Sequence, residues 1–175
     1  GAAGNRNLLS SRGKQSGPAT RKNWWAVWQM NLTRLLKLFK QKALLKGFNF
    51  NKEAILGSIL YNPFAVDVAT GVITINGLVP INEVAIPQGA THMTLRGSWT
   101  KVDFATGESN VQETNAINLP IDATSTDVVL TPTAVPASAG TDLYLLMIEF
   151  FQQVNGVQYT LKNGAYNALS IIEIQ

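Results

Sequence analysis

One histidine restricts the acid–base chemistry open to this chain of 175 residues. His92 lies between Thr91 and Met93 in a stretch where polar and apolar residues alternate, a pattern typical of a β-strand. A serine–histidine–aspartate triad would have to use this residue, because the chain contains no other histidine. A strand histidine that contacts a polar neighbour is the expected role. We therefore predict no catalytic residues and no enzymatic activity.

The remaining polar residues match no common metal-binding or phosphate-binding motif. The chain has no cysteine, which excludes thiolate nucleophiles and Cys-rich zinc sites. Its aspartates are scattered and lack the alternating spacing of a calcium loop, and no Gly-x-x-x-x-Gly-Lys-Ser/Thr run occurs. A glycosidase-type pair of carboxylates depends on spatial proximity, which the sequence does not reveal. We predict no cofactor, no metal ligand and no small-molecule substrate.

Basic side chains interleaved with tryptophans fit a binding function better. Residues 1–52 contain eleven Lys and Arg and no acid, whereas residues 53–175 contain three bases and eleven acids. The formal charges of the two parts are therefore +11 and, as three minus eleven, −8. The basic part suits phosphate contacts with base stacking, or docking on the acidic part of a neighbouring copy. The residues expected at such a contact are Arg6, Arg12, Lys14, Arg21, Lys22, Trp24, Trp25, Trp28, Arg34 and Lys37.

An amphipathic helix is predicted to present several of these residues. In a helix, successive residues are rotated by about 100° around the axis. An apolar stripe about 120° wide is then formed by Trp24, Trp28, Leu32, Leu35, Leu36, Phe39 and Ala43. Asn23 suits the N-cap of this helix, and Gly47 suits the position just after its last turn. The apolar stripe is expected to pack on the rest of this chain, on a partner subunit or on a membrane surface.

Composition divides the chain into three parts. Residues 1–22, rich in Gly, Ser, Ala and bases, are predicted to form a flexible arm, and residues 23–60 an amphipathic helical segment. Residues 61–175 are predicted to form a β-sandwich domain. Only 14% of the residues are charged, which favours secretion or burial in an assembly, extracellular or viral. No signal peptide is visible, and no apolar run is long enough for a transmembrane segment, so the compartment is not predicted.

Short strand patterns separated by turn residues fill the third part. They run over 64–68, 72–75, 83–86, 91–104, 111–119, 127–130, 143–154, 157–161 and 165–174. The segment 143–154 is apolar on both faces, which indicates a central strand, and Asn155-Gly156 predicts a tight hairpin after it. Gly97 is expected to mark a bulge. The fold class predicted is mainly β, an antiparallel β-sandwich of Ig-like or jelly-roll-like type, preceded by a basic arm and an amphipathic helix.

Three short runs carry a resemblance to known proteins: GFNFN at 47–51, IPQGATHM at 86–93 and VNGVQY at 154–159. With these runs the chain resembles a group of uncharacterised bacterial proteins of Bacteroidetes type, which have a basic helical N-terminal part and a β-sandwich. The resemblance covers most of the chain and implies no activity. In outline alone, a basic arm followed by a β-sandwich is similar to small viral coat proteins.

Three functions are compatible with these patterns. The first is a non-enzymatic structural subunit that self-assembles as a homo-oligomer, of virion, sheath or filament type, with the arm and helix on neighbouring subunits. The second is a nucleic-acid-binding protein that uses the basic N-terminal segment. The third is a secreted β-sandwich module that binds glycans or proteins. For Trp99, Tyr144 and Tyr159, packing in the core or at its rim is favoured over a stacking platform for sugars.

Overall fold

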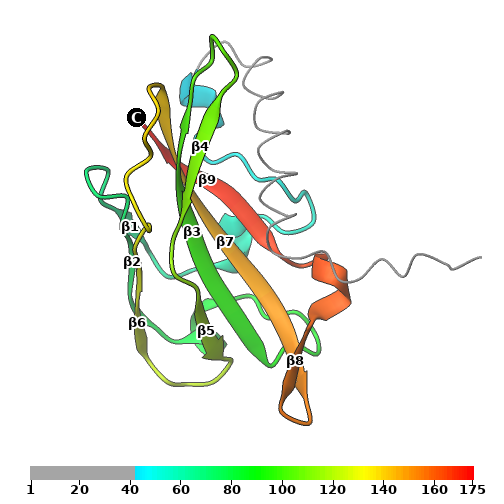
Figure 1. Ribbon diagram of the computed structural model, residues 1–175. Helices are drawn as coiled ribbons and strands as arrows, with labels where there is room; N and C mark the ends of the chain where they lie inside the picture. Colours follow the sequence, from blue (N-terminus) through cyan, green and yellow to red (C-terminus); the bar gives the residue numbers. More distant parts are fainter. Residues whose placement is uncertain (1–41) are drawn as a thin grey trace, which may run out of the picture.

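Two antiparallel β-sheets make up the part of the protein that the computed structural model describes, residues 42–175 (Figure 1). The prediction of a mainly β protein is confirmed. The arm predicted at residues 1–22 and most of the amphipathic helix predicted from Trp24 lie outside the described residues.

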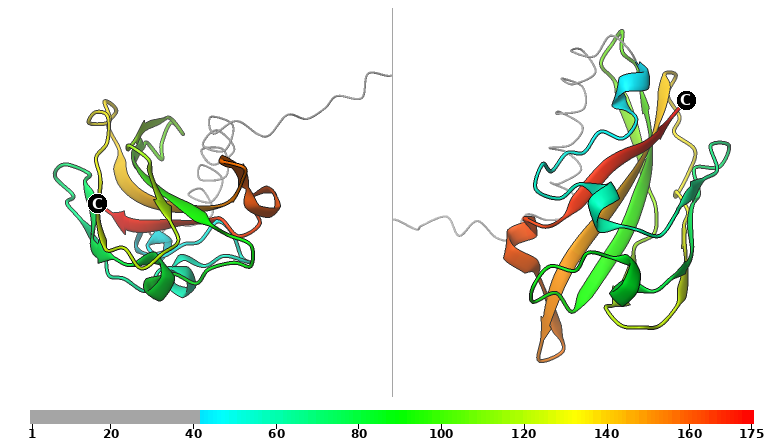
Figure 2. Two further views of the ribbon diagram at one scale, coloured as in Figure 1. Left: turned by 90° about the horizontal axis from the view of Figure 1, so that it is seen from below. Right: turned by 180° about the vertical axis from the view of Figure 1, so that it is seen from behind.

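Two long strands form the centre of the larger sheet. β3 and β7 pair antiparallel from His92 opposite Phe151 to Val102 opposite Thr141. Two shorter strands follow each other along the outer side of β3, and two more along the outer side of β7. The bounds are β3 (His92–Val102), β4 (Ser109–Glu113), β5 (Ile117–Pro120), β7 (Thr141–Val154), β8 (Val157–Thr160) and β9 (Ala168–Ile174). The sheet curls along its length, as the end-on view in Figure 2 shows.

The smaller sheet has the strand order β1-β2-β6. Its members are β1 (Ala65–Val66), β2 (Ile73–Leu78) and β6 (Thr126–Leu130). β1 and β2 form the hairpin that the sequence predicts at this place, closed by a bond from the Gly71 N–H to the Asp67 carbonyl oxygen (2.7 Å). A positive φ at Gly71 makes glycine the natural residue for this turn.

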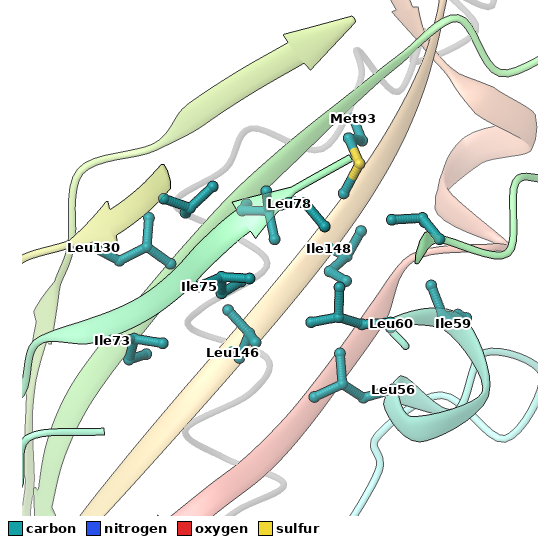
Figure 3. Packing of buried hydrophobic residues seen from close by; sticks show 14 of the residues in the cluster. Leu56, Ile59, Leu60, Ile73, Ile75, Leu78, Met93, Leu130, Leu146 and Ile148 are labelled. Carbon is teal, nitrogen blue, oxygen red and sulfur yellow. The ribbon is translucent and has the colours of Figure 1, made fainter. Parts of the chain in front are cut away.

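The main hydrophobic core lies between the two sheets (Figure 3). Ile73 and Ile75 of β2 belong to the same buried cluster as Leu146 and Ile148 of β7. The helical turn α2 (Leu56–Ile59) adds further leucine and isoleucine side chains to this cluster, so the segment just before the strands contributes to the core. We call the side of the larger sheet that faces this cluster its core face.

A second cluster covers the opposite side of the larger sheet. Leu143, Leu145 and Met147 of β7 point to that side, next to Leu45 of the 3₁₀ turn η1 (Lys42–Leu45). Residues 47–50 then run beside β9, with bonds such as Gly47 N–H to the Ile171 carbonyl (2.7 Å). Because alternate residues of β7 are buried on both faces, the prediction of a central strand covered on both sides is confirmed.

Residues 83–86, which the sequence predicts as a strand, start instead with a helical turn. α3 (Pro80–Glu83) has proline at its first position, where the missing N–H costs no hydrogen bond. The Glu83 carboxylate accepts the Val79 N–H at 2.7 Å and so caps the turn. Only one isolated bridge, between Val84 and Leu60, has strand character.

The irregularity predicted at Gly97 is present on one side of β3 only: Leu95 pairs with Ile117 and Ser98 with Glu113, so the outer partner has one extra residue opposite 96–97. The pairing of β3 with β7 continues through Gly97 without a shift. A Cβ atom at this position would lie 2.5 Å from Ile73 Cδ1 and 2.9 Å from the Leu145 carbonyl oxygen. Glycine is therefore required because β2 of the smaller sheet approaches the larger sheet closely here.

The strand predicted over residues 111–119 is divided into β4 and β5. At the break, the Thr114 hydroxyl accepts the Gly97 N–H at 2.8 Å. The neighbouring Asn115 then bonds to the other sheet, accepting the Thr131 N–H (2.7 Å) and donating to the Val129 carbonyl (3.1 Å). These bonds join the two sheets along one side.

Candidate functional site

The contact residues predicted from the sequence lie outside the described residues. They are Arg6, Arg12, Lys14, Arg21, Lys22, Trp24, Trp25, Trp28, Arg34 and Lys37. Their roles stay predictions. The candidate sites that can be built from geometry are those within residues 42–175.

His92, at the start of β3, contacts a polar neighbour. Its Nδ1 atom lies 3.0 Å from the hydroxyl of Thr91, which also accepts the Gln153 N–H at 2.7 Å. No carboxylate of the described part bonds to the imidazole, and no group of three potential metal ligands occurs within residues 42–175. The bonds of Thr91 to Gln153 and Phe151 join the start of β3 to β7, and His92 contacts this threonine.

A buried ion pair stands on the side of the larger sheet opposite the core. Arg96 Nε lies 3.0 Å from Glu149 Oε1, and the two side chains are 7% and 10% exposed. Thr94, Ser98 and Thr100 are buried next to them on β3. A buried pair of this kind is costly to break, because the remaining charge is left in a poorly hydrated place. Its position on adjacent central strands indicates that it fixes their arrangement.

The curl of the sheet is held by a pair of amide side chains. Asn118 of β5 and Gln158 of β8 exchange two hydrogen bonds, at 2.9 and 3.0 Å. In a flat sheet their strands would be three spacings apart, about 14 Å, which these side chains cannot bridge. Asn118 Nδ2 also donates to Thr94 Oγ1 (2.9 Å), which places the pair on the side of Arg96 and Glu149. We call this side the concave face.

Trp99 and Tyr144 form a buried aromatic pair. Their rings stack at 5.7 Å between centroids, and only 5% and 1% of the two residues is exposed. The Trp99 indole donates to Asp142 (2.6 Å), and the Tyr144 hydroxyl donates to the Val68 carbonyl (2.6 Å). Burial, together with the charge of Asp142, raises the pKa of Tyr144 to about 12. Because these two rings are buried, they cannot form an open sugar platform with Tyr159.

The β7–β8 hairpin carries a group of exposed apolar residues. It extends at one end of the larger sheet (Figure 1). Val154, Val157 and Tyr159 are 49%, 50% and 58% exposed. Val157 pairs with Val154, and Tyr159 pairs with Gln152, so the three side chains stand on the same face of the hairpin. A patch of this kind is typical of a contact surface.

The turn of this hairpin is the one that the sequence predicts. Asn155 has φ 50° and Gly156 has φ 78°, as a type I′ turn requires. The hairpin extends β7 beyond its buried residues, since the last three residues of β7 are exposed. Its shape is thus set by local sequence, whereas its contact with Asn118 depends on the curl of the whole sheet.

No helix within residues 42–175 has the length and apolar character needed to cross a bilayer. Comparisons with protein families, with curated proteins and with solved structures found no match to this chain. The resemblance to Bacteroidetes-type proteins therefore stays a prediction, and proposals of function rest on the chain's own residues.

Proposed function

We propose that this protein is a non-enzymatic structural subunit of an assembly of identical copies, of virion, sheath or filament type. In this proposal its two sheets form a β-sandwich of Ig-like or jelly-roll-like type. The observation that supports it most is the β7–β8 hairpin, which holds Val154, Val157 and Tyr159 about half exposed. Single exposed apolar residues are common on monomers, but a group on a projecting hairpin is typical of an interface.

The charge distribution supplies a second contact. The basic residues 1–52 are complementary to the −8 charge of residues 53–175. One such pair is present in the structure: Lys46 Nζ lies 2.9 Å from Glu173 Oε2, and this bond lowers the pKa of the Glu173 carboxyl. The more N-terminal bases are proposed to reach acids of a neighbouring subunit in the same way.

Removal of residues 1–22 tests the role of the arm. All described strands lie beyond residue 60, so the shortened protein is expected to keep the circular-dichroism melting curve of the parent. Its particle mass, measured by size-exclusion chromatography with light scattering, is expected to be smaller. The matched control keeps the length of the arm and replaces its five bases by glutamine: Arg6, Arg12, Lys14, Arg21 and Lys22.

Salt provides an independent measurement of the same contact. Raising the ionic strength shortens the Debye length from about 10 Å at 0.1 M to about 3 Å at 1 M. The mass of the full chain is therefore expected to fall in 1 M salt towards that of the shortened chain. An unchanged mass after truncation, after charge removal and in high salt would show that the arm takes no part in assembly.

The basic segment also favours the alternative of nucleic-acid binding, and the same variants decide it. Binding of a single-stranded DNA oligonucleotide should weaken steeply with salt, and glutamine at the five arm positions should flatten that dependence. If the full chain binds the oligonucleotide tightly and stays monomeric without it, the alternative replaces the structural role.

A further inference from the structure

The outer edge of β8 directs peptide groups away from the sheet at two positions. The Phe151 carbonyl accepts the Thr91 N–H (2.8 Å), and the Gln153 N–H donates to Thr91 Oγ1 (2.7 Å), so both residues direct their peptide groups away from β8. Their partners across the hairpin are Thr160 and Gln158. In an antiparallel pair, the peptide groups of these partners must then point outward. Thr160 is also the N-cap of the 3₁₀ turn η2 (Leu161–Gly164), so its carbonyl belongs to that turn. Within residues 42–175, no bond from outside the strand is found to the Thr160 N–H or to the peptide groups of Gln158.

β8 is short, but it lacks the charged residues and proline by which many edge strands avoid pairing with other chains. Charged residues and proline are the usual protection. Glu113 in β4, Pro120 in β5 and Asp127 in β6 supply it on the other edge strands longer than two residues. The edge of β9 is covered by residues 47–50. β8 has the sequence VQYT, and residues 150–161 around it contain no charge.

The strand is also held in place before any partner arrives. The tight Asn155-Gly156 turn joins the start of β8 to β7, and two hydrogen bonds between the nearby Gln158 and Asn118 join the same end to β5. A strand that is already ordered loses little conformational freedom on pairing. The apolar side chains of Val154, Val157 and Tyr159 stand on the core-face side, free of this amide contact.

We propose that β8 is an assembly contact. It pairs antiparallel with β8 of a second copy, and the two-fold axis that relates the copies passes between the two Tyr159 residues. This inference rests on the proposed function and names one of its interfaces. With Tyr159 opposite its counterpart, Gln158 of each copy faces Thr160 of the other. Both residues direct N–H groups outward, and the Gln158 carbonyl of each copy accepts the Thr160 N–H of the other, which gives two symmetric bonds across the axis.

Two further features favour a second copy over a different partner. The two Tyr159 residues form a non-hydrogen-bonded pair, in which side chains approach most closely, and aromatic cross-strand pairs are favourable. Residues 53–175 of each copy carry −8, so the acidic parts of two copies repel one another and can approach best at an uncharged edge. The larger sheets of the two copies then become one continuous sheet.

A single-cysteine variant tests this register directly, because the chain has no cysteine of its own. In Tyr159→Cys, the two sulfurs would stand on Cα atoms about 4.5 Å apart, within the range of a disulfide. Mild oxidation is expected to link most of the full-length protein into covalent dimers on a non-reducing gel. The control is Val157→Cys, whose two copies would lie four residues apart along the pairing, about 14 Å, and should stay largely unlinked.

A charge at the edge gives a second measurement. Tyr159→Lys places two like charges opposite each other and is expected to reduce the particle mass measured by light scattering. Tyr61→Lys is the matched control, because Tyr61 is 61% exposed and lies outside the hairpin. The melting curve of each variant shows that it folds.

The outcomes separate this inference from the proposed function. A parent protein that is monomeric throughout would overturn both. An assembly that forms but shows equal linking of the two cysteine variants, and an equal mass for the two lysine variants, overturns β8 pairing and leaves the structural role intact. Selective linking at position 159 together with a selective loss of mass in Tyr159→Lys supports both.

Discussion

At the scale of single residues, a few polar side chains form hydrogen bonds with backbone groups that have no backbone partner. Glu83 is one of them: its carboxylate accepts the Val79 N–H at 2.7 Å and the Asn62 amide at 2.9 Å. The bond from Val79, followed by that from Asn62, lowers the pKa of Glu83 below its ordinary 4.5. Its stabilising effect is therefore present above pH 4.5 and is lost as the pH falls through the lowered value.

The variant Glu83→Gln is expected to melt a few degrees below the parent at neutral pH. The difference in melting temperature should shrink as the pH falls below 4.5 and through the lowered pKa of Glu83, because the folded parent then takes up a proton on this carboxylate. Thermal melts from pH 7 to pH 3 measure it, with the exposed Glu53→Gln as the control. A gap between Glu83→Gln and the parent that stays constant over this range would show that the charge at Glu83 has no role.

At the scale of elements, local patterns predicted some features and missed others for a physical reason. The two apolar faces of β7 and the turn at Asn155-Gly156 depend on side-chain alternation and on positive φ, which are properties of the local sequence. The helical turn at Pro80 replaced a strand because one carboxylate caps it. The close approach at Gly97 depends on β2, far away in the sequence, and so had no local signal.

The candidate site on the β7–β8 hairpin could likewise be predicted from the local sequence only in part. Asn155-Gly156 predicted the hairpin, but the exposure of Val154, Val157 and Tyr159 follows from where the core ends. That the outer peptide groups belong to Gln158 and Thr160 depends on bonds that Thr91 makes to β7. The charge pattern of residues 1–52 predicted a contact segment that lies largely outside the described residues, so its part in the site stays a prediction.

The hairpin turn is tested by a pair of alanine substitutions. An added Cβ meets nothing within 4 Å at either Gly156 or Gly57, but only Gly156 has a positive φ, 78°. Gly156→Ala is therefore expected to lower the free energy of unfolding by about 1–2 kcal/mol. Gly57→Ala is expected to be neutral or stabilising by up to about 1 kcal/mol. Denaturant titrations measure both, and equal effects would show that backbone conformation does not decide the difference.

At the scale of the whole molecule, two features combine. A body of two antiparallel sheets has one uncharged, unprotected edge, and a basic segment is joined to an acidic body. The first allows copies to pair through β8, and the second allows each copy to hold a neighbour through its arm. Because the two contacts use different parts of the chain, an assembly can extend beyond a dimer.

Sedimentation of the full-length protein over a series of concentrations at physiological salt tests the central claim most directly. Self-assembly predicts a particle mass that is a multiple of the 19.0 kDa chain and that rises with concentration towards a defined value. Electron micrographs of the same samples are expected to show regular particles or filaments. A mass of 19.0 kDa at every concentration would contradict the claim that this protein is a structural subunit.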